Sequence, residues 1–377
     1  MFSKIRSLIF KFEPEVAHSL AIKALKYNFV PPKKIPNNKL IETKLFSKII
    51  KNPIGLAAGF DKDAEVYNSI FDLGFGFVEV GTVTPLKQYG NKKPRVFRLE
   101  EDEALINRLG FNNSGSEEVL SKITKNKPKG LLGINIGPNK DSQNRLEDYL
   151  VCFRKFHNFA DYITINISSP NTENLRSFHN KSELNELLKL INEEKKILNS
   201  AVPIVVKISP DIQEDDIPTI SELLLKFEIS AVIISNTTDS TRENLININK
   251  LEKGGLSGKP IEKKSNNLIS KFYKILRGKI LIIGVGGVDS GKSAFEKFLN
   301  GANLVQLYTG MVYKGPNIAS IISEELINIL EKKGVKNISD IIGNKKWSWL
   351  ETLLHLYNLN FYVKKMWTYW KNTSKRS

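Results

Sequence analysis

The segment Asn166-Ile167-Ser168-Ser169-Pro170-Asn171-Thr172 gathers several side chains that could carry chemistry. It follows a predicted strand, and Pro170 restricts the backbone of Ser169. No Gly-x-Ser-x-Gly turn surrounds Ser169, and none of the four histidines stands in an evident partnership with it, so the pattern does not indicate an acyl nucleophile. The segment instead favours a hydroxyl that relays a proton.

Lys62 and Lys207 are cations inside or directly after apolar runs, where a surface lysine is not expected. A lysine in such a place usually meets an anion, and the sequence leaves open whether Lys207 meets a ligand or a carboxylate such as Glu79. Asparagines occupy matching positions on three other runs: Asn135, Asn166 and Asn236. Single buried asparagines are often structural, but three at strand ends suit a planar ligand with amide edges.

Two glycine-containing turns follow the last two apolar runs, at Gly284-Val285-Gly286-Gly287 and Tyr308-Thr309-Gly310. Glycine also serves tight turns that bind nothing. Two such turns on adjacent strand ends, however, expose backbone amides where barrels commonly hold a phosphate. They favour a phosphorylated ligand.

These residues need a scaffold, and the sequence supplies short β-branched runs that alternate with helix-patterned segments, the sign of βαβ units. Eight runs are predicted as strands: Ile54–Ala57, Phe77–Gly81, Leu131–Ile136, Tyr162–Ile167, Ile204–Ile208, Ala231–Ser235, Ile280–Gly284 and Leu304–Tyr308. Eight nearly continuous apolar runs favour a closed (β/α)8 TIM barrel, an α/β fold, over an open doubly wound sheet. The polar clusters then fall at the carboxyl ends of the strands, which is the catalytic face of such a barrel.

Two regions exceed a minimal barrel. Residues 85–130 are too many for one crossover and predict extra strands or a substrate loop. Residues 1–40 carry Val16, Leu20 and Ala24 at helical spacing, and Pro31-Pro32 ends that pattern, which predicts a small N-terminal helical domain.

Composition limits the class of protein. The chain has 377 residues, of which 41% are hydrophobic and 25% charged, and a single cysteine, Cys152. It lacks a membrane-spanning apolar stretch, zinc-ligand spacing and a secretion signal, and Cys152 is expected to be a buried apolar residue in a reducing compartment. The net charge of +16 is spread along the chain, which favours solvated faces over a nucleic-acid site.

Taken together, the motifs resemble those of the dihydroorotate dehydrogenases, and in particular the membrane-associated, quinone-reducing class. The resemblance covers residues 1–343 and rests on motifs in the family's order: Gly55 to Lys62, Gly81 to Pro85, Asn107 to Asn113, Gly133 to Gly137, Asn166 to Thr172, Ser235 to Thr238, Gly254 to Gly258 and Gly284 to Val288.

The resemblance implies the binding residues. FMN would be held by Ala58, Gly59, Phe60, Asp61, Lys62, Thr82, Asn135, Asn166, Lys207, Ser235, Gly258, Gly287, Tyr308 and Thr309. Dihydroorotate would be held by Lys62, Asn107, Arg108, Leu109, Gly110, Phe111, Asn166, Asn171, Asn236 and Thr237. No metal site is implied.

It also implies the roles of the reacting groups. Ser169 would take the C5 proton of dihydroorotate and pass it on through Thr172 or water, and Lys207 would stabilise the reduced flavin. Lys62 would meet the substrate carboxylate. A serine at the base position, where the soluble class has a cysteine, and the helical leader both favour the quinone class. The leader would admit a membrane quinone near three residues: His18, Arg98 and Tyr308. Without the resemblance, His18 would be an ordinary half-exposed helix histidine.

The expected organisation is a quinone-tunnel and membrane-association domain at 1–40, an FMN-binding barrel at 41–343 and an extension at 344–377. The extension holds all four tryptophans and seven Lys/Arg against one acidic residue, which suits either a second membrane-surface anchor or a tail without function.

The predicted activity is the oxidation of dihydroorotate with a quinone as electron acceptor, in pyrimidine biosynthesis. The predicted location is the lipid surface on the cytoplasmic side of a bacterial inner membrane, in preference to a mitochondrial one. The alternatives are a soluble FMN-dependent dihydroorotate or dihydropyrimidine dehydrogenase with another acceptor, and a non-catalytic membrane-surface binding protein.

Overall fold

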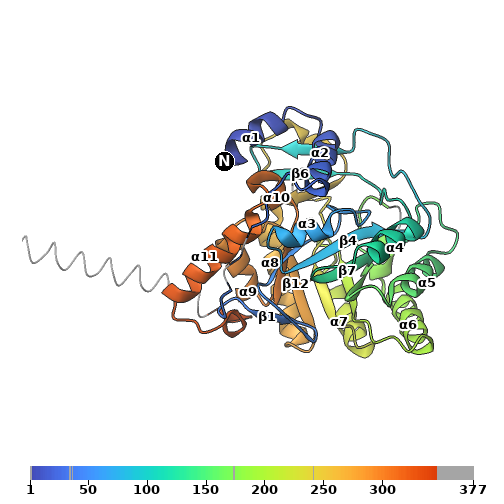
Figure 1. Ribbon diagram of the computed structural model, residues 1–377. Coiled ribbons are helices and arrows are strands. Elements are labelled where there is room, and N and C mark those ends of the chain that lie inside the picture. The colour runs from blue at the N-terminus through green and yellow to red at the C-terminus, as the bar shows by residue number, and fades with distance from the viewer. Residues whose placement is uncertain (1, 34, 36, 173–174, 241, 346–377) are drawn as a thin grey trace, which may run out of the picture.

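The computed structural model describes residues 2–345 except 34, 36, 173–174 and 241, and within these residues eight parallel strands close into a barrel (Figure 1). Around the barrel the strands follow one another as β10 (Ala231–Ile234), β12 (Leu281–Val285), β13 (Leu304–Leu307), β3 (Ile54–Leu56), β4 (Phe77–Val83), β7 (Leu131–Ile136), β8 (Tyr162–Asn166) and β9 (Ile204–Ile208). Each predicted run matches its strand within two residues. The TIM-barrel prediction is confirmed, and the doubly wound sheet is excluded.

Helices follow the strands and cover the outside of the barrel. They are α3 (Tyr67–Asp72), α4 (Ser116–Lys125), α5 (Arg145–Phe156), α6 (Lys181–Ile197), α7 (Asp216–Lys226), α8 (Glu262–Leu276), α9 (Gly291–Leu299) and α11 (Ile318–Lys332), with the short α10 (Thr309–Lys314). Short 3₁₀ turns are η1 (Leu175–His179), η2 (Ile248–Leu251), η3 (Lys259–Ile261) and η4 (Ile338–Ile341). The helices are amphipathic: α6, for example, buries Leu184, Leu187, Leu188 and Ile191 on one face. Cys152 is buried in α5, as predicted.

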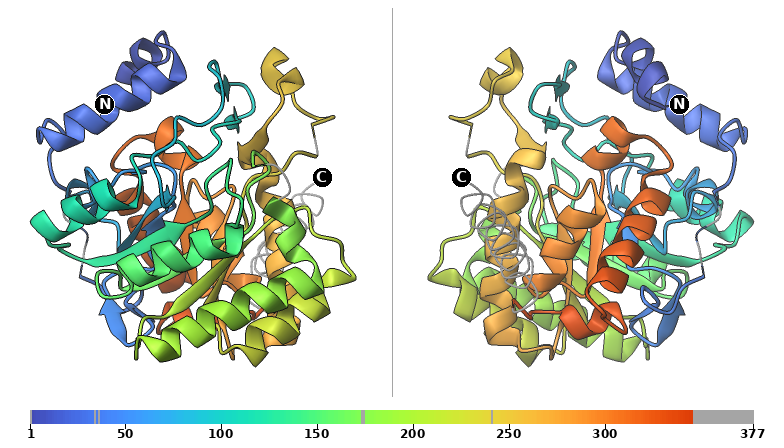
Figure 2. Two further views of the ribbon diagram at one scale, coloured as in Figure 1. Left: turned by 90° about the vertical axis from the view of Figure 1, so that its right-hand side faces the viewer. Right: turned by 90° about the vertical axis from the view of Figure 1, so that its left-hand side faces the viewer.

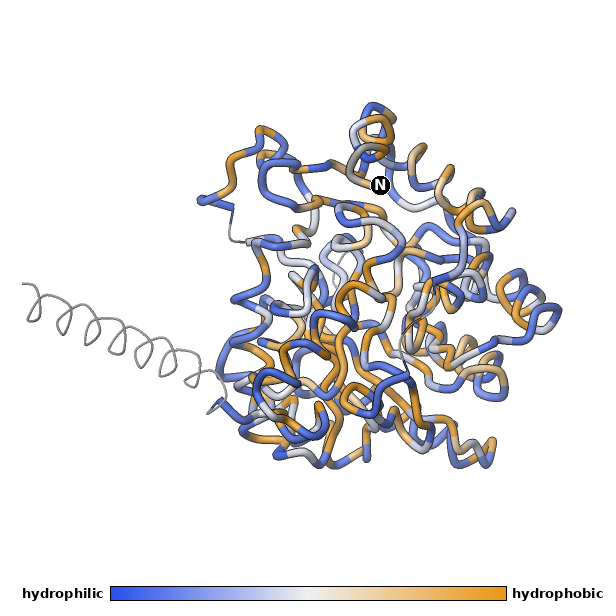
Figure 3. Tube along the Cα trace, turned by 60° about the vertical axis from the view of Figure 1, so that its left-hand side comes forward, coloured by the Kyte–Doolittle hydropathy of each residue, from blue (hydrophilic) through white to orange (hydrophobic). Residues whose placement is uncertain are grey.

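An apolar plug fills the amino-terminal end of the barrel. The rings of Phe77 and Tyr162 occupy the space beside glycines of neighbouring strands, since a Cβ atom on Gly55 would lie 2.4 Å from Phe77 and one on Gly133 would lie 2.1 Å from Tyr162. The hairpin of β1 (Thr43–Leu45) and β2 (Lys48–Ile50) packs Leu45 into the same cluster. The trace through the barrel is accordingly largely hydrophobic in Figure 3. Polar chemistry is therefore left to the carboxyl end.

A small antiparallel sheet lies over that carboxyl end. It consists of β5 (Val96–Leu99), β6 (Ala104–Asn107) and β11 (Gly255–Gly258), in the order β11-β6-β5. Two of its strands come from residues 85–130, so the prediction of extra strands there is confirmed. The third arrives from the crossover after β10, which was not predicted.

Two helices, α1 (Phe2–Ile9) and α2 (Pro14–Lys26), cross the same end of the molecule (Figure 2). Arg95 anchors α2 through Glu15, with Nη2 2.9 Å from Oε1, and Arg98 donates to the carbonyls of Phe10 and Phe12 at 3.2 and 2.8 Å. The helical prediction for the leader holds as far as Lys26. The described residues include no helix long and apolar enough to cross a bilayer. The Trp-rich anchor predicted at 344–377 lies outside the described residues, except for its first two positions.

Candidate active site

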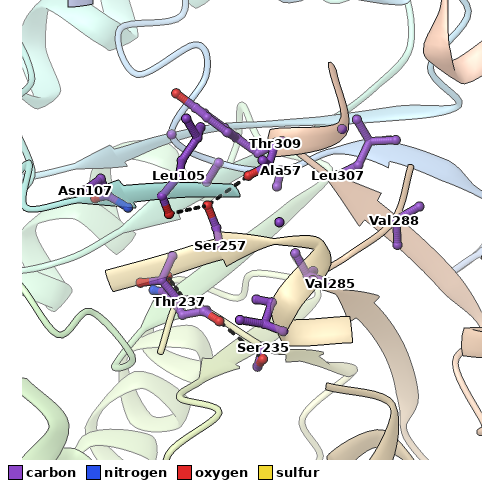
Figure 4. Close-up of a pocket in the computed structure, with 18 of the residues that line it drawn as sticks. Ala57, Leu105, Asn107, Ser235, Thr237, Ser257, Val285, Val288, Leu307 and Thr309 are labelled. Atoms are coloured by element: carbon purple, nitrogen blue, oxygen red, sulfur yellow. Dashed lines mark hydrogen bonds between the residues drawn. The ribbon is translucent and has the colours of Figure 1, made fainter. Parts of the chain in front are cut away.

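A pocket opens at the carboxyl ends of the barrel strands, between the barrel and the small sheet (Figure 4). Most of the predicted site residues line it: Ala58, Gly59, Lys62, Thr82, Asn107, Leu109, Gly110, Phe111, Asn166, Ser169, Asn171, Lys207, Ser235, Asn236, Thr237, Gly258, Gly287, Tyr308 and Thr309. They come from segments between 58 and 309 that only the closed barrel brings together.

The two serines after β8 differ in what their hydroxyls do. Ser168 Oγ donates to Asn166 Oδ1 at 2.7 Å and accepts from Asn236 Nδ2 at 2.9 Å, so it serves the wall of the pocket. Ser169 Oγ lines the pocket and accepts the backbone N–H of Asn171 at 3.2 Å. Among the described residues no acceptor is present for the Ser169 hydroxyl proton. Of the two serines, only Ser169 lines the pocket with a hydroxyl proton that has no acceptor among the described residues.

Arg176 fixes the loop that carries these serines. Its Nε donates to the carbonyl of Ser168 at 3.3 Å, and its Nη2 donates to the carbonyl of Thr237 at 3.0 Å. Nη1 lies 3.2 Å from carboxylate oxygens of both Asp211 and Asp239. The serine loop and the loop after β10 are thereby held together across the pocket. No sequence motif indicates this role of Arg176.

A buried polar layer supports the floor of the pocket. Asn166 Nδ2 donates to Thr82 Oγ1 at 2.9 Å and to Asn135 Oδ1 at 3.2 Å, and Thr82 Oγ1 donates to Asn135 Oδ1 at 2.6 Å. Asn135 Nδ2 in turn donates to the carboxylate of Glu79 at 2.8 Å. Asn135 is fully buried and stands behind Thr82 and Asn166 rather than in the pocket wall. Its predicted FMN contact stays a prediction, whereas its contact with the two lining residues is visible.

Lys207 at the end of β9 is 5% exposed and opens to the pocket. Within the described chain its ammonium group makes no hydrogen bond or ion pair, so the ion pair with Glu79 that the sequence left open is not formed. Burial lowers the pKa of Lys207, and the charge of Glu79 opposes that shift at longer range. Such a cation suits a ligand that gains negative charge.

Lys62 reaches the pocket from the loop after β3 and donates to the carbonyl of Gly59 at 2.6 Å. Burial lowers its pKa to about 8, and the carboxylates of Asp63 and Glu15 act in the opposite direction. Below that pH the group is a cation facing the pocket, fit for an anionic substituent.

The predicted phosphate region is a cradle of backbone and hydroxyl groups. Gly258, Gly286 and Gly287 have φ values of +98°, +110° and +76°, which other residues rarely adopt, and a Cβ on Gly287 would lie 2.4 Å from the Cβ of Glu262. Beside these glycines, Ser257 Oγ and Thr309 Oγ1 lie 2.8 Å apart (Figure 4). Glycine is therefore required here by the backbone conformation and by close packing against neighbouring residues, and the two hydroxyls are the polar groups that this region offers to a ligand.

Three rings connect α2 with the pocket. The rings of His18 and Phe60 have centroids 5.0 Å apart, and those of Phe60 and Tyr308 are 6.0 Å apart. Burial, with help from Lys62, lowers the pKa of His18 to about 3, so the ring is neutral at physiological pH. Arg98 does not line the pocket, and its guanidinium carbon lies 4.6 Å from the centroid of the Phe10 ring.

Six predicted site residues are not in the pocket wall: Phe60, Asp61, Asn135, Arg108, His18 and Arg98. Asp61 accepts the backbone N–H groups of Glu65 and Val66 at 2.7 and 2.9 Å and so shapes the Lys62 loop, while Arg108 pairs with Glu252 at 2.7 Å. Their proposed ligand contacts remain predictions. Residues that line the pocket but were not predicted include Val96, Leu105, Ser257, Tyr313 and Lys314. Ser257 belongs to the Gly254–Gly258 motif, so the sequence could have indicated it as a site residue. The other four reach the pocket only because of how the small sheet packs over the barrel, which the sequence does not show.

The fold and site define a (β/α)8-barrel protein whose catalytic face holds a largely apolar pocket with amides, hydroxyls and lysines in its wall. The family profile described as Dihydroorotate dehydrogenase matches residues 40–330. A protein of Bartonella henselae named "Dihydroorotate dehydrogenase (quinone)" is 45% identical over 354 residues, covering 93% of this chain and 97% of that one. A protein of Buchnera aphidicola with the same name is 47% identical over 328 residues, with 83% and 96% covered. The crystal structure of DHODH from Eimeria tenella in complex with ferulenol superimposes with a TM-score of 0.85 at 35% identity, covering 88% of this chain and 95% of that one. The chain belongs to the dihydroorotate dehydrogenase family.

Proposed function

We propose that this enzyme oxidises (S)-dihydroorotate to orotate with one FMN per chain and passes the electrons to a membrane quinone, within de novo pyrimidine biosynthesis. One observation carries the proposal: in a pocket lined by Lys207 and an amide wall, the Ser169 hydroxyl has no acceptor among the described residues. Oxidation of dihydroorotate removes a proton and a hydride: the hydroxyl would take part in the proton transfer, and the cation would stabilise the negative charge of the group that accepts the hydride.

The pocket fits FMN. The glycines with positive φ and the Ser257–Thr309 pair suit its phosphate, and the Oγ1 of Thr237 is a buried polar atom without a hydrogen-bond partner among the described residues, so it is ready for a bound ligand. Bound FMN would supply the acceptor for the C6 hydride and the carrier through which those electrons reach the quinone. Lys207 would hold positive charge at the flavin edge.

Ser169 would accept the C5 proton of dihydroorotate. Because a serine hydroxyl is a weak base, Ser169 must lose its own proton as it gains the new one. The outgoing proton would leave through Thr172, which is 5% exposed on the same loop, or through water. The N–H of Asn171, donated to Ser169 Oγ, would orient the hydroxyl and stabilise charge that develops on it.

The orotate pocket would lie between this loop and the loop after β6. Asn107 Oδ1 accepts from Asn171 Nδ2 at 3.3 Å, which joins the two loops and places their amides side by side. Together with Asn166, Asn236 and Thr237 these amides would pair with the ring edges, and Lys62 would meet the carboxylate.

The leader would dock on a lipid surface. Apolar side chains on α1 and α2 and in the turn between them face solvent, with Leu8 59%, Phe12 46%, Val16 48% and Leu20 48% exposed. An amphipathic pair of this kind lies in the membrane interface rather than across it. A quinone entering beneath the leader would reach the ring series of His18, Phe60 and Tyr308. With bacterial relatives of the same name, the proposed location is the cytoplasmic face of a bacterial inner membrane.

Ser169→Ala tests the base. The variant should keep its FMN and lose roughly 10²- to 10⁴-fold in the rate of flavin reduction by dihydroorotate, measured anaerobically by stopped flow. Ser169→Cys should retain part of the rate, because a thiolate is also a proton acceptor. An alanine variant within threefold of wild type would remove Ser169 from the mechanism.

The acceptor is tested separately. Decylubiquinone should sustain dihydroorotate turnover, while fumarate and NAD should not; the reverse result would indicate a soluble dehydrogenase. A purified protein whose flavin absorbance is not bleached by dihydroorotate would be a barrel without this activity.

The lipid contact is tested by partition into anionic vesicles. Leu20→Glu should lower partition and leave turnover with a soluble dye unchanged. Ile49→Glu is the matched control, since Ile49 is 64% exposed on the hairpin at the opposite end of the barrel. Equal partition of both variants would contradict the proposed docking of the leader.

A further inference from the structure

Lys297 on α9 is a fully buried lysine that the proposed mechanism does not use. Its Nζ donates to Ser265 Oγ at 3.0 Å and to Asn266 Oδ1 at 2.9 Å, both neutral acceptors on α8. No carboxylate lies within 4 Å of it among the described residues. Burying a lone ammonium costs several kcal/mol, so a protein that keeps one there has a use for the charge or for its hydrogen bonds.

The lysine stands directly behind the glycine turn of the pocket. A Cβ on Gly284 would lie 3.0 Å from its Cδ, so Gly284 leaves room for the lysine stem. Ser265 Oγ, which accepts from Lys297, donates to the carbonyl of Val285 at 2.5 Å. That carbonyl also accepts the N–H of Ser235 at 3.2 Å. Two hydrogen bonds thus join the ammonium to the backbone of residues that line the pocket.

We propose that Lys297 is an electrostatic anchor for the phosphate of the bound flavin, acting from behind the Gly286–Gly287 turn and through Ser265 rather than by contact. The inference rests on the proposed FMN site and adds to it a residue outside the pocket wall. Its ligand chemistry is specific, because a dianionic phosphate responds to a nearby buried charge and the uncharged end of a riboflavin does not.

Protonation of Lys297 would be coupled to binding. Burial lowers its pKa to about 7, and the charged group that acts on it is Glu262, whose own pKa is raised by burial. Near neutral pH the ligand-free lysine is then partly unprotonated. An arriving phosphate dianion favours the ammonium, so FMN binding should take up protons.

The test compares FMN with riboflavin on the apoprotein by fluorescence quenching. Lys297→Met should weaken the binding of FMN roughly tenfold to a hundredfold and leave the binding of riboflavin within threefold of wild type, because only FMN carries the charged phosphate. Lys292→Met is the matched control, because Lys292 is an exposed lysine on the same helix and undergoes the same substitution. Equal weakening of both flavins would show a purely structural lysine and overturn the proposal, as would unchanged FMN affinity.

A second measurement uses the wild-type protein, in case Lys297→Met does not fold. Calorimetry at pH 7.5 in two buffers of different ionisation enthalpy should show proton uptake with FMN in excess of that with riboflavin. Equal uptake for the two ligands would overturn the role of Lys297 even if FMN binds well. Failure of the wild-type protein to bind either flavin would instead overturn the proposed function, and the inference with it.

Discussion

Replacing Glu79 by glutamine should lower the stability of the barrel and shift the alkaline side of the pH–activity profile to lower pH. Glu79 is fully buried inside the barrel, where Oε1 accepts from Asn135 at 2.8 Å. Oε2 accepts from three further groups: Tyr162 Oη at 3.0 Å, Thr164 Oγ1 at 3.2 Å and Gln306 Nε2 at 3.0 Å. A glutamine keeps one acceptor oxygen and turns an NH₂ group toward at least one of these donors.

The magnitude follows from that count. In the better orientation the glutamine oxygen takes the Oε2 position and one hydrogen bond, to Asn135, is lost. A hydrogen bond to a charged group contributes about 1.5–3 kcal/mol, so the loss of this bond in Glu79→Gln should lower the free energy of unfolding by about that amount. The exposed Glu117→Gln on α4 should change it by less than about 1 kcal/mol.

The second effect concerns Lys207. The negative charge of Glu79 raises the pKa of Lys207 against the larger effect of burial, so removing that charge should lower the pKa further. A lysine with a lower pKa loses its proton at lower pH, and activity that needs the cation should therefore decline at lower pH. The pKa of Lys62 is shifted by burial and by neighbours other than Glu79. The part of the pH profile that reports the titration of Lys62 should therefore not move in the variant.

The assay is anaerobic flavin reduction by dihydroorotate between pH 6 and 10, together with urea denaturation of the same preparations. A variant that is less stable but keeps the wild-type alkaline limb would refute the electrostatic link between Glu79 and Lys207. A variant with wild-type stability would refute the hydrogen-bond count.

Three further perturbations test the packing and the loop. Gly133→Ala should reduce the free energy of unfolding by about 1–3 kcal/mol or prevent folding, since the new Cβ would lie 2.1 Å from the ring of Tyr162, as thermal denaturation would show. Cys152 should not react with Ellman's reagent in the folded protein, because burial raises the pKa of its thiol far above neutrality; rapid reaction would contradict its placement. Arg176→Gln should keep FMN and lower the rate of flavin reduction roughly 10- to 100-fold by releasing the carbonyl of Ser168, and an unchanged rate would show that the loop holds its position without it.

The barrel could be predicted because its strands are buried on both sides. Parallel strands covered by helices show nearly continuous apolar runs, and seven of the eight strands are followed within two residues by a polar residue or a glycine that begins the loop to the pocket. The small sheet was harder to foresee. Its strand β11 is Gly255–Gly258, a run without the β-branched residues that mark a strand, and it forms because antiparallel pairing with β6 satisfies its backbone.

Site residues could be predicted where the motif puts a side chain at a strand end, as for Ser169, Lys207 and Asn236. The sequence could not separate residues that line the pocket from residues that support them. Asn135 occupies a strand position that matches those of the lining asparagines, yet it stands behind Thr82, because its partner Glu79 is inside the barrel. That distinction depends on how the side chains of neighbouring strands face one another, and the sequence of a single strand does not show this.

Lys297 shows the same limit on the outside of the barrel. In Gly291-Lys292-Ser293-Ala294-Phe295-Glu296-Lys297-Phe298-Leu299 it reads as one of many helix lysines in a chain of high basicity. The helix register turns Lys297 inward with Phe298, whereas Lys292 points to solvent. A buried ammonium is retained against its desolvation cost only if something offsets that cost, and the neutral acceptors on α8 do so incompletely. A phosphate dianion held on the other side of the glycine turn would offset the rest of that desolvation cost. The comparison of FMN with riboflavin therefore tests both why the buried ammonium is tolerated and which ligand the pocket holds.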